Sequence, residues 1–439
     1  MSAHDGGAGE AGEAGRNGQA RGDAHRTVDA VWRIESPRLI AGLTRTVHDL
    51  GLAEELAQDA LVAALEQWPR EGVPRNPGAW LMTTAKRRAI DQIRRDETFA
   101  RKLRLLGHEL EIEQGAAAFA EPAEPEEIED DLLRLVFTAC HPVLSREARV
   151  ALTLRLLGGL TTDEIARAFL TGEPTVAQRI VRAKRTLAKE RVPFEVPYGP
   201  ERAQRLASVL EVVYLIFNEG YSATAGDDWM RPGLCEDALR LARVLAGLMP
   251  QEPEVHGLAA LLEIQASRSA ARGGAEPVLL LDQDRGRWDQ LLIRRGFAAL
   301  ARADAAARAR EAAPGPYALQ AAIAACHARA ATAQETDWGR IAELYRALSL
   351  VTGSPVVELN RAVAVGMADG PAAGLAIADA VAGAPALGGY HLLPAVRGDL
   401  LLRLGRAAEA RAEFERAAGL TRNNAERVFL RRRAESSGG

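Results

Sequence analysis

The chain has 439 residues and a formal net charge of −4, and its composition is 47% apolar and 26% charged. This balance excludes a disordered chain, and the net negative charge disfavours a protein that only coats nucleic acid. At roughly 100–200 residues per domain, the length predicts two or three domains. Aromatic residues make up only 5%, while the helix formers Ala, Leu, Arg and Glu dominate, so we predict an all-α fold.

Composition divides the chain into five segments. Residues 1–26 are rich in Gly and Ala, which predicts a disordered tail. Residues 27–105 and residues 130–192 are each predicted to form a helical domain that ends in a basic stretch. Between them, residues 106–129 contain many Glu and two Pro but no Lys or Arg, which is typical of a linker. Residues 198–432 are predicted to be a long series of amphipathic helices separated by short Gly/Pro loops.

The first helical domain contains two amphipathic stretches. GLAEELAQDALVAALEQW (residues 51–68) places Leu52, Leu56 and Ala60 on one helix face. After a proline-containing break, AWLMTTAKRRAIDQIRRDE (residues 79–97) can pack Leu81 and Ala85 inward. Its outward side carries Lys86, Arg87, Arg88, Arg94 and Arg95. Such a basic face is often merely solvated, but it could also neutralise phosphates and release their counterions.

The second helical domain contains a predicted helix-turn-helix. Thr161 followed by Glu164 fits a capping box that opens a helix, and Pro174 suits the start of the next helix. That next helix, residues 175–187, turns Val176, Ile180, Ala183 and Leu187 inward. Its outward residues are Gln178, Arg179, Arg182, Lys184 and Arg185. Two helices joined by a tight turn, with a basic second helix, are typical of DNA recognition, although helical hairpins also occur without it.

The two basic modules together resemble the extracytoplasmic-function sigma factors of bacteria. AEELAQDALVAAL is similar to the region-two helix that docks on the polymerase clamp, and NPGAWLMTTAKRRAIDQIRR to the segment that melts and reads the −10 element. GLTTDEIARAFLTGEPTVAQRIVRAKRTLAKE is similar to region four, which reads the −35 element. The resemblance implies a region-two helical bundle, a region-four helix-turn-helix, and core RNA polymerase and promoter DNA as partners.

Residue roles follow from this resemblance by position. The residues implied to face the polymerase clamp are Gln58, Asp59 and Leu61. Those implied to lie along the opened −10 DNA are Trp80, Lys86, Arg87, Arg88 and Arg94, and the neighbouring Arg95 extends the same basic face. Those implied to enter the −35 major groove are Thr175, Gln178, Arg179 and Arg182, with Lys184 and Arg185 beside them.

The C-terminal half resembles the helical extension of one sigma-factor subgroup, which is similar to tetratricopeptide repeats. Matching stretches include LEVVYLIFNEGYSAT, TDWGRIAELYRAL and LLLRLGRAAEARAEFERA. In the last of these, Ala410, Phe414 and Ala417 have the spacing of the second helix of such a repeat. Stacked helix pairs leave a concave surface, so we expect a regulatory contact domain with a protein regulator as its candidate partner.

Alternative functions leave weaker patterns. The three cysteines are scattered, which suits a reducing cytoplasm, and Cys140–His141 alone cannot build a zinc site. Asp282, Asp284 and Asp289 do not fit a calcium loop and are predicted to cap helices, and residues 217–221 are predicted to form a buried polar junction. We find no pattern for an enzyme, a cofactor, a metal or a membrane span. A helix-turn-helix regulator with a helical sensor domain is the main alternative.

Overall fold

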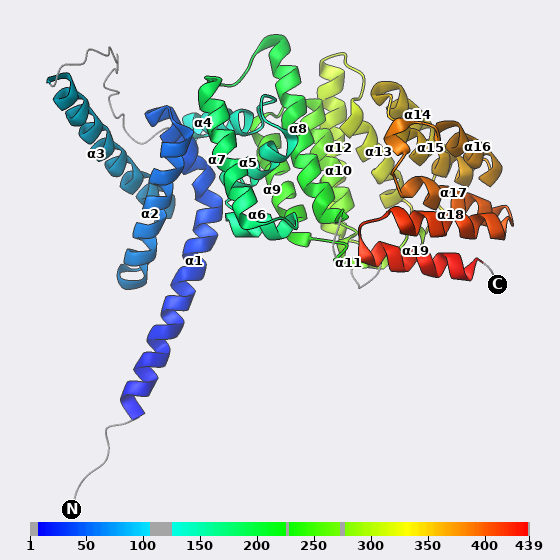
Figure 1. Cartoon of the computed structure of the whole chain (residues 1–439), viewed down its shortest axis with the longest axis horizontal. Coiled ribbons are helices and arrows are strands. Elements are labelled where there is room, and N and C mark those ends of the chain that lie inside the picture. Colours follow the sequence, from blue (N-terminus) through cyan, green and yellow to red (C-terminus); the bar gives the residue numbers. More distant parts are fainter. Residues whose placement is uncertain (1–7, 106–124, 225–227, 273–276, 438–439) are drawn as a thin grey trace, which may run out of the picture. The chain divides into compact units, whose positions relative to one another are not determined.

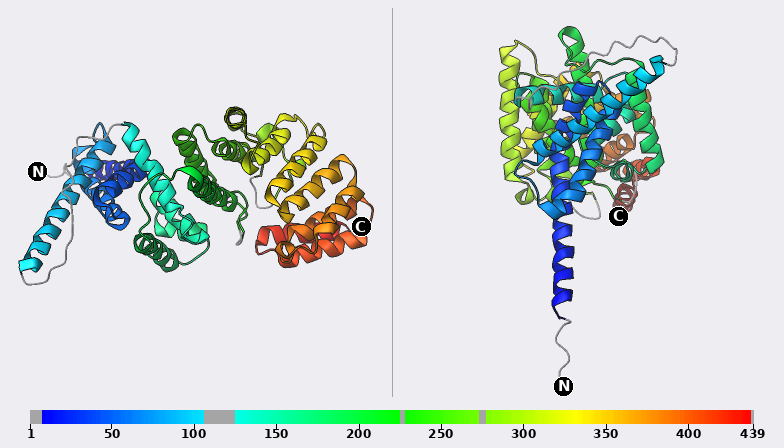
Figure 2. Two further views of the ribbon diagram at one scale, coloured as in Figure 1. Left: turned by 90° about the horizontal axis from the view of Figure 1, so that it is seen from above. Right: turned by 90° about the vertical axis from the view of Figure 1, so that its left-hand side faces the viewer.

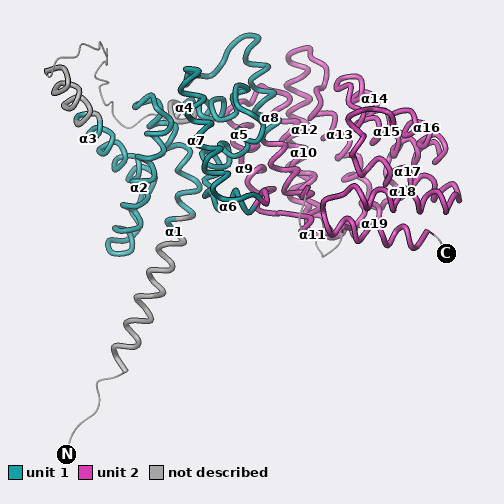
Figure 3. Tube along the Cα trace, in the orientation of Figure 1, with its two compact units in different colours: residues 1–167, 171–212 teal, residues 168–170, 213–439 magenta. Residues whose placement is uncertain are grey.

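The computed structural model describes residues 8–105, 125–224, 228–272 and 277–437. Every regular element in these ranges is helical (Figure 1), so the predicted all-α fold is confirmed. The chain divides into two compact units (Figure 3). Unit 1 comprises residues 1–167 and 171–212, and unit 2 comprises residues 168–170 and 213–439.

Unit 1 begins with three helices that pack on one another. They are α1 (Ala8–Val47), α2 (Leu50–Glu71) and α3 (Pro77–Leu105). The side chain of Asp49 opens α2 by accepting the N–H of Leu52 at 2.8 Å, which satisfies one of the free donors at the helix start. The buried core between the helices includes Leu39, Leu43, Leu56, Trp68 and Leu81. This bundle therefore fixes the orientation of the basic face on α3.

Four further helices complete most of unit 1. They are α4 (Pro125–Ala139), α5 (Arg146–Leu156), α6 (Thr162–Ala168) and α7 (Glu173–Lys189). Their core includes Phe137, Leu152, Leu154, Ile165 and Ile180. The first part of α8 (Gly199–Tyr221) also belongs to this unit. There the Arg205 guanidinium donates to the Phe137 carbonyl at 3.1 Å, and the Ser208 hydroxyl donates to the Cys140 carbonyl at 2.6 Å.

Unit 2 contains the remaining helices. They are α9 (Pro232–Leu248), α10 (Pro253–Ala266), α11 (Ser269–Arg272), η1 (Leu280–Asp282), η2 (Arg285–Arg287), α12 (Gln290–Ala309), α13 (Pro316–Arg329), α14 (Trp338–Thr352), α15 (Pro355–Ala368), α16 (Pro371–Val381), η3 (Pro385–Leu387), α17 (Leu392–Arg403), α18 (Ala407–Leu420) and α19 (Asn424–Ser436). Several begin at a proline, whose missing N–H costs nothing at the first helical position. Consecutive helices from α13 to α19 pack side by side (Figure 2).

Small residues bring the helices of unit 2 close together. A Cβ on Gly257 of α10 would lie 2.6 Å from the backbone nitrogen of Ala318 in α13. A Cβ on Gly296 of α12 would lie 2.4 Å from the Cγ1 of Ile264 in α10. At these two positions only glycine permits the observed approach. In α18, Ala410, Phe414 and Ala417 are fully buried, as their spacing predicts.

Several local predictions can be compared with the structure. Asp284 caps η2 and Asp289 caps α12, which confirms the predicted capping role for these two, whereas Asp282 is the last residue of η1 and caps none of the helices that the structure describes. Glu219 forms an ion pair with Arg231 in the half-buried junction at the end of α8. Helix α1 begins at Ala8, within residues 1–26, which the sequence predicts to be a disordered tail. Most of the predicted linker, residues 106–124, lies outside the described residues.

Candidate nucleic-acid interface

The basic face of α3 is held in place by an apolar face on the opposite side. Leu81, Ala85 and Ala89 are buried against the bundle. Of the predicted DNA-binding residues, Arg87 and Arg94 are exposed and Lys86 and Arg88 are half-buried. The Arg95 side chain lies outside the described residues.

The predicted −10 residue Trp80 lies at the start of α3 and is half-buried. Its ring meets the buried ring of Trp68 from α2 edge to face, with centroids 5.4 Å apart. Edge-to-face contacts of this kind favour a fixed ring position. Trp80 is therefore a positioned aromatic side chain with part of its surface open.

The predicted polymerase-binding residues lie on α2. Asp59 is exposed, and Gln58 and Leu61 are half-buried. The carboxylate of Asp59 lies 3.4 Å from the guanidinium of Arg88 on α3. The amide of Gln58 donates to Glu54 at 2.7 Å on the same helix. The structure thus brings one predicted polymerase-binding residue into contact with one predicted DNA-binding residue.

The predicted helix-turn-helix is formed by α6 and α7. The Thr161 N–H donates to Glu164 at 2.8 Å, and the Glu164 N–H donates to the Thr161 hydroxyl at 3.1 Å, so the predicted capping box is confirmed. Leu170 in the turn has a φ of 48°, a left-handed conformation that reverses the chain. The Thr162 hydroxyl donates to Glu173 at 3.2 Å and joins the two helices.

The candidate recognition helix is α7. Its predicted inward residues Val176, Ile180, Ala183 and Leu187 are all buried. Thr175, Gln178, Arg182 and Arg185 are exposed, and Arg179 is half-buried. These residues offer one amide and several guanidinium groups on one side of the helix, the groups that pair with base edges and phosphates. Lys184 differs from them because it forms an ion pair with Glu54 of α2.

A buried carboxylate explains the position of Lys184. Glu54 on α2 is only 4% exposed and forms ion pairs with Lys184 of α7 and with Arg155 of α5, whose Nε lies 2.7 Å from its carboxylate. Burial raises the pKa of Glu54, but the charges and hydrogen bonds of Lys184 and Arg155 outweigh it and hold that pKa below its ordinary value. Sequence reasoning missed this contact, although Glu54 shares a helical stripe with Ala57, Leu61 and Ala64.

Two further ion pairs connect the first three helices of unit 1 with the following ones. Arg45 of α1 lies 2.9 Å from Asp131 of α4, whose side chain is 2% exposed. Arg33 of α1 lies 2.8 Å from Glu164 in the capping box of α6. The α2–α3 face and the α6–α7 hairpin are thus held in one unit by charged contacts.

The remaining reactive groups of unit 1 have a structural setting. Cys140 is fully buried, its sulfur lies 3.3 Å from the Thr153 hydroxyl, and burial raises the pKa of its thiol to about 11. Burial and the nearby Arg205 lower the pKa of His141 to about 4. Within the described ranges no group of His, Cys, Asp and Glu could hold a metal ion. In the same ranges, no helix has the length and apolar character that crossing a membrane requires.

Known protein families match three parts of the chain. Residues 32–98 match Sigma-70 region 2, and residues 134–187 match Sigma-70, region 4. Residues 205–304 match a family of unknown function (DUF6596). The likeness of the C-terminal half to tetratricopeptide repeats therefore stays a prediction.

Individual relatives fall into two groups. An uncharacterized protein of Rhizobium meliloti (strain 1021) is 44% identical over 399 residues, which are 90% of this chain and 92% of the relative. The ECF RNA polymerase sigma factor SigK of Mycobacterium tuberculosis (strain ATCC 25618 / H37Rv) is 29% identical over 159 residues, 34% of this chain and 78% of that protein. SigK of Mycobacterium sp. (strain KMS) is 30% identical over 171 residues, 36% of this chain and 80% of that protein. No solved structure matches the chain significantly.

Proposed function

We propose a division of promoter recognition among the helices of this chain. The chain belongs to the RNA polymerase sigma factors of the extracytoplasmic-function type. Sigma factors are transcription initiation factors and not enzymes. In the proposal, α2 binds the clamp of core RNA polymerase in the cytoplasm, α3 lies along the opened −10 DNA, and α7 reads the −35 element. Unit 2 regulates these steps by contact with another protein.

The observation that supports this function most directly is the outward face of α7. Thr175, Gln178 and Arg182 are exposed on a helix that opens directly after a tight turn and whose other face is buried. A side-chain amide can pair with an adenine edge, and a guanidinium can pair with guanine or phosphate. The hairpin lies within the part of the chain that matches Sigma-70, region 4.

The proposed division within region 2 rests on the two neighbouring helices α2 and α3. Lys86, Arg87 and Arg94 supply positive charge for phosphates, and Trp80 offers an aromatic surface to an unstacked base. Gln58, Asp59 and Leu61 would contact the clamp. Because Asp59 pairs with Arg88, polymerase binding to Asp59 would release the Arg88 guanidinium for DNA.

Transcription with purified core polymerase tests the proposal. We expect the chain to start promoter-specific transcripts from core enzyme alone, which a helix-turn-helix regulator without polymerase contacts cannot do. Absence of promoter-specific transcripts, across candidate promoters from the same genome, would contradict the sigma-factor function and favour the regulator.

The role of α7 is tested with Gln178→Ala and Arg179→Ala. Each should weaken promoter binding by roughly 1–3 kcal/mol if a base edge is read, and the loss should depend on the −35 sequence. Lys189→Ala, a change at an exposed residue in the last turn of the same helix, is the control for a general loss of charge. An equal loss across all −35 sequences would assign these residues to phosphate contact instead.

The regulatory role of unit 2 is tested by removing it. A cut after Arg191 would also remove Arg205 and Ser208, which bond to α4 and the residue after it, so the cut should follow Tyr221 at the end of α8. We expect the shortened chain to differ from the full chain in polymerase binding, promoter activity or response to its natural signal. Equal behaviour in all three would contradict a regulatory role.

A further inference from the structure

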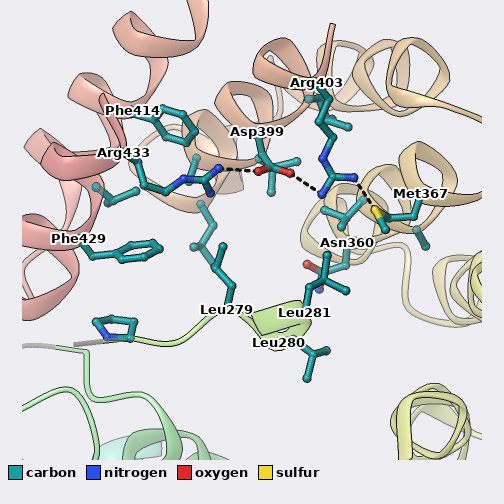
Figure 4. A pocket seen from close by; sticks show the side chains of 18 of the residues that line it. Leu279, Leu280, Leu281, Asn360, Met367, Asp399, Arg403, Phe414, Phe429 and Arg433 are labelled. Atoms are coloured by element: carbon teal, nitrogen blue, oxygen red, sulfur yellow. Dashed lines mark hydrogen bonds and ion pairs between the residues drawn. The ribbon is translucent and has the colours of Figure 1, made fainter. Parts of the chain in front are cut away.

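Unit 2 contains a cavity of about 430 Å³ that no role described so far explains (Figure 4). Its walls come from helices α13 to α15 and α17 to α19 and from the segment that leads into η1. The volume falls within the ~300–1,000 Å³ typical of small-molecule sites, which are concave, mostly apolar and furnished with a few polar groups.

The greater part of the wall is apolar. Leu279, Leu280 and Leu281 follow one another along the segment that crosses the cavity, and Ala395, Val396 and Phe429 line it from α17 and α19. Leu279, which lines the cavity, is 41% exposed. Figure 4 shows its side chain pointing toward Asp399 and Arg433. An apolar ligand that covered these side chains would gain about 25 cal/mol for each Å² removed from water.

The polar end of the cavity is formed by one carboxylate between two arginines. Asp399 accepts from Arg433 at 2.8 Å and lies 3.1 Å from Arg403, so the group carries a net positive charge (Figure 4). Arg403 also contacts the sulfur of Met367. A guanidinium has five N–H donors, so each arginine retains donors beyond those that Asp399 uses.

The two carboxylates that line the cavity already have partners. Asp399 pairs with two arginines, and Glu426 accepts from the Thr421 hydroxyl at 2.7 Å and lies 3.3 Å from His391. At this end of the cavity the spare hydrogen-bonding groups are the guanidinium N–H donors of Arg403 and Arg433, which call for an acceptor on the ligand.

His327 adds an independent observation. It lines the cavity, is 7% exposed, and its Nδ1 has no hydrogen-bond partner among the residues that the structure describes. Burial and the charges of Arg268 and Arg285 lower its pKa to about 3, so the imidazole is neutral, with one N–H donor and one acceptor nitrogen. A buried polar group without a partner costs free energy, which a bound ligand could recover.

We propose that this cavity binds a small amphipathic carboxylate. The apolar body lies against Leu279–Leu281 and Phe429, and the carboxylate accepts hydrogen bonds from Arg403 and Arg433. The C-terminus of a peptide offers the same chemistry, but the moderate volume favours a small molecule. The site lies wholly in unit 2, so ligand binding can be measured directly, without a transcription assay.

Three probes with the same apolar body test the proposal on the full chain: octanoate, octanol and octylamine. Isothermal titration calorimetry should show one octanoate per chain, and octanoate should raise the melting temperature. Octanol should bind at least about tenfold more weakly because it lacks the charge, a difference that corresponds to about 1.4 kcal/mol. Octylamine, with a positive head group, should not bind.

Two variants separate the two halves of the site. Arg403→Gln should weaken octanoate binding at least about tenfold and leave octanol binding unchanged, because an ionic hydrogen bond is worth more than a neutral one. Ala395→Phe should weaken binding of both by narrowing the apolar part of the cavity. Arg411→Gln, on the exposed face of α18, is the matched control and should change neither. Circular dichroism verifies that each variant is folded.

Three results would overturn the proposal. The first is the absence of octanoate binding at millimolar concentrations. The second is equal binding of octanoate and octylamine, or binding that neither folded variant changes. The third is binding of acetylated trileucine with a free C-terminus but not of octanoate, which would assign the cavity to a peptide terminus.

Discussion

Ion pairs join helices in both units of this protein, and unit 2 adds close contacts at helix glycines. In unit 1, buried carboxylates connect helices that are far apart in the sequence: Glu54 pairs with Arg155 and Lys184, and Asp131 pairs with Arg45. In unit 2, helix glycines allow a close approach: a Cβ on Gly257 would lie 2.6 Å from the backbone nitrogen of Ala318, and a Cβ on Gly296 would lie 2.4 Å from the side chain of Ile264. Charged groups can exchange one partner for another, whereas closely packed backbones cannot separate without exposing a core.

This difference suggests different tasks for the two units. Lys184, on the candidate recognition helix, could exchange the Glu54 carboxylate for a DNA phosphate, because the carboxylate and the phosphate are both negatively charged. The glycine contacts of α10 offer no such exchange. We therefore expect contacts within unit 1 to change during function, while unit 2 keeps one arrangement around its cavity.

The largest effect is expected from a side chain at a glycine contact. In Gly257→Val, the new Cβ would lie 2.6 Å from the Ala318 backbone nitrogen, so helices α10 and α13 must move apart. We expect the free energy of unfolding to fall by about 3 kcal/mol or more, measured by urea denaturation. Gly247→Ala, whose Cβ meets nothing within 4 Å, should instead stabilise the chain slightly. A similar loss in both variants would contradict the importance of the close approach.

A smaller effect is expected from Glu54→Gln, which removes the buried charge but retains a hydrogen-bonding group. Arg155 and Lys184 are 23% and 22% exposed, so water offsets part of the loss. We expect unit 1 to lose about 1–3 kcal/mol of stability, measured by hydrogen exchange of α2 and α7. Glu55→Gln alters an exposed neighbour and is the control. If Glu54→Gln and Glu55→Gln lost equally little stability, the Glu54 carboxylate would not hold α2, α5 and α7 together.

The two units should also respond oppositely to pH through one glutamate each. The folded-state pKa of Glu54 lies below its ordinary value near 4.5, so its contribution is present above that pH and is lost on acidification through the folded pKa. Burial raises the pKa of Glu254 in unit 2, although its carboxylate accepts hydrogen bonds from the N–H groups of Tyr317 and Ala318, which lower the pKa. The stability that Glu254 contributes is present at a pH below its ordinary pKa and is lost as the pH rises through its folded-state pKa.

Urea denaturation across this acidic range, followed by hydrogen exchange of each unit, measures the two contributions. Glu54→Gln should reduce the acid sensitivity of unit 1, and Glu254→Gln should reduce the loss in unit 2 as pH rises. The same direction of change in both units would contradict the assigned causes.

The smallest effect is expected from an exposed ion pair in unit 2. Arg411 and Glu415 on α18 lie 2.9 Å apart, and their side chains are 55% and 56% exposed. Arg411→Ala should change the free energy of unfolding by less than about 1 kcal/mol, and added salt should reduce that difference further. Melting curves with and without salt measure this difference. A loss of stability as large as that of Glu54→Gln would contradict the distinction between buried and exposed ion pairs.

Local periodicity predicted much of the fold and part of the candidate interface. It identified the capping box of Thr161 and Glu164 and the buried face of α7, because each depends on residues within one or two helical turns. Periodicity assigned Lys184 to the outward face of α7, but the Lys184 side chain is half-buried there. The partner, Glu54, is 130 positions away in the sequence, and local pattern carries no information about which distant helix covers a face.

The cavity of unit 2 was beyond prediction for the same reason. Leu279–Leu281 is visible in the sequence as a short apolar run, which is equally consistent with a strand or a core segment. Its position among α14, α15, α17 and α19 depends on how separate helices stack. The ion pairs of Asp399 with Arg403 and Arg433 join α17 to itself and to α19, and only the first has a regular helical spacing.

The contact between Glu54 and Lys184 has a consequence for promoter choice. DNA advances about 34–36 Å in each helical turn, and the −10 and −35 elements lie more than one turn apart. If α3, which packs on α2, lies along the −10 element and α7 reads the −35 element as proposed, the ion pair between α2 and α7 must open before both elements can be read. The free energy of separation acts as a threshold that every promoter must exceed, because apparent affinity falls with the fraction of molecules that are already open. Weak matches would fail at this threshold, so a single buried carboxylate would narrow the set of promoters that the protein uses.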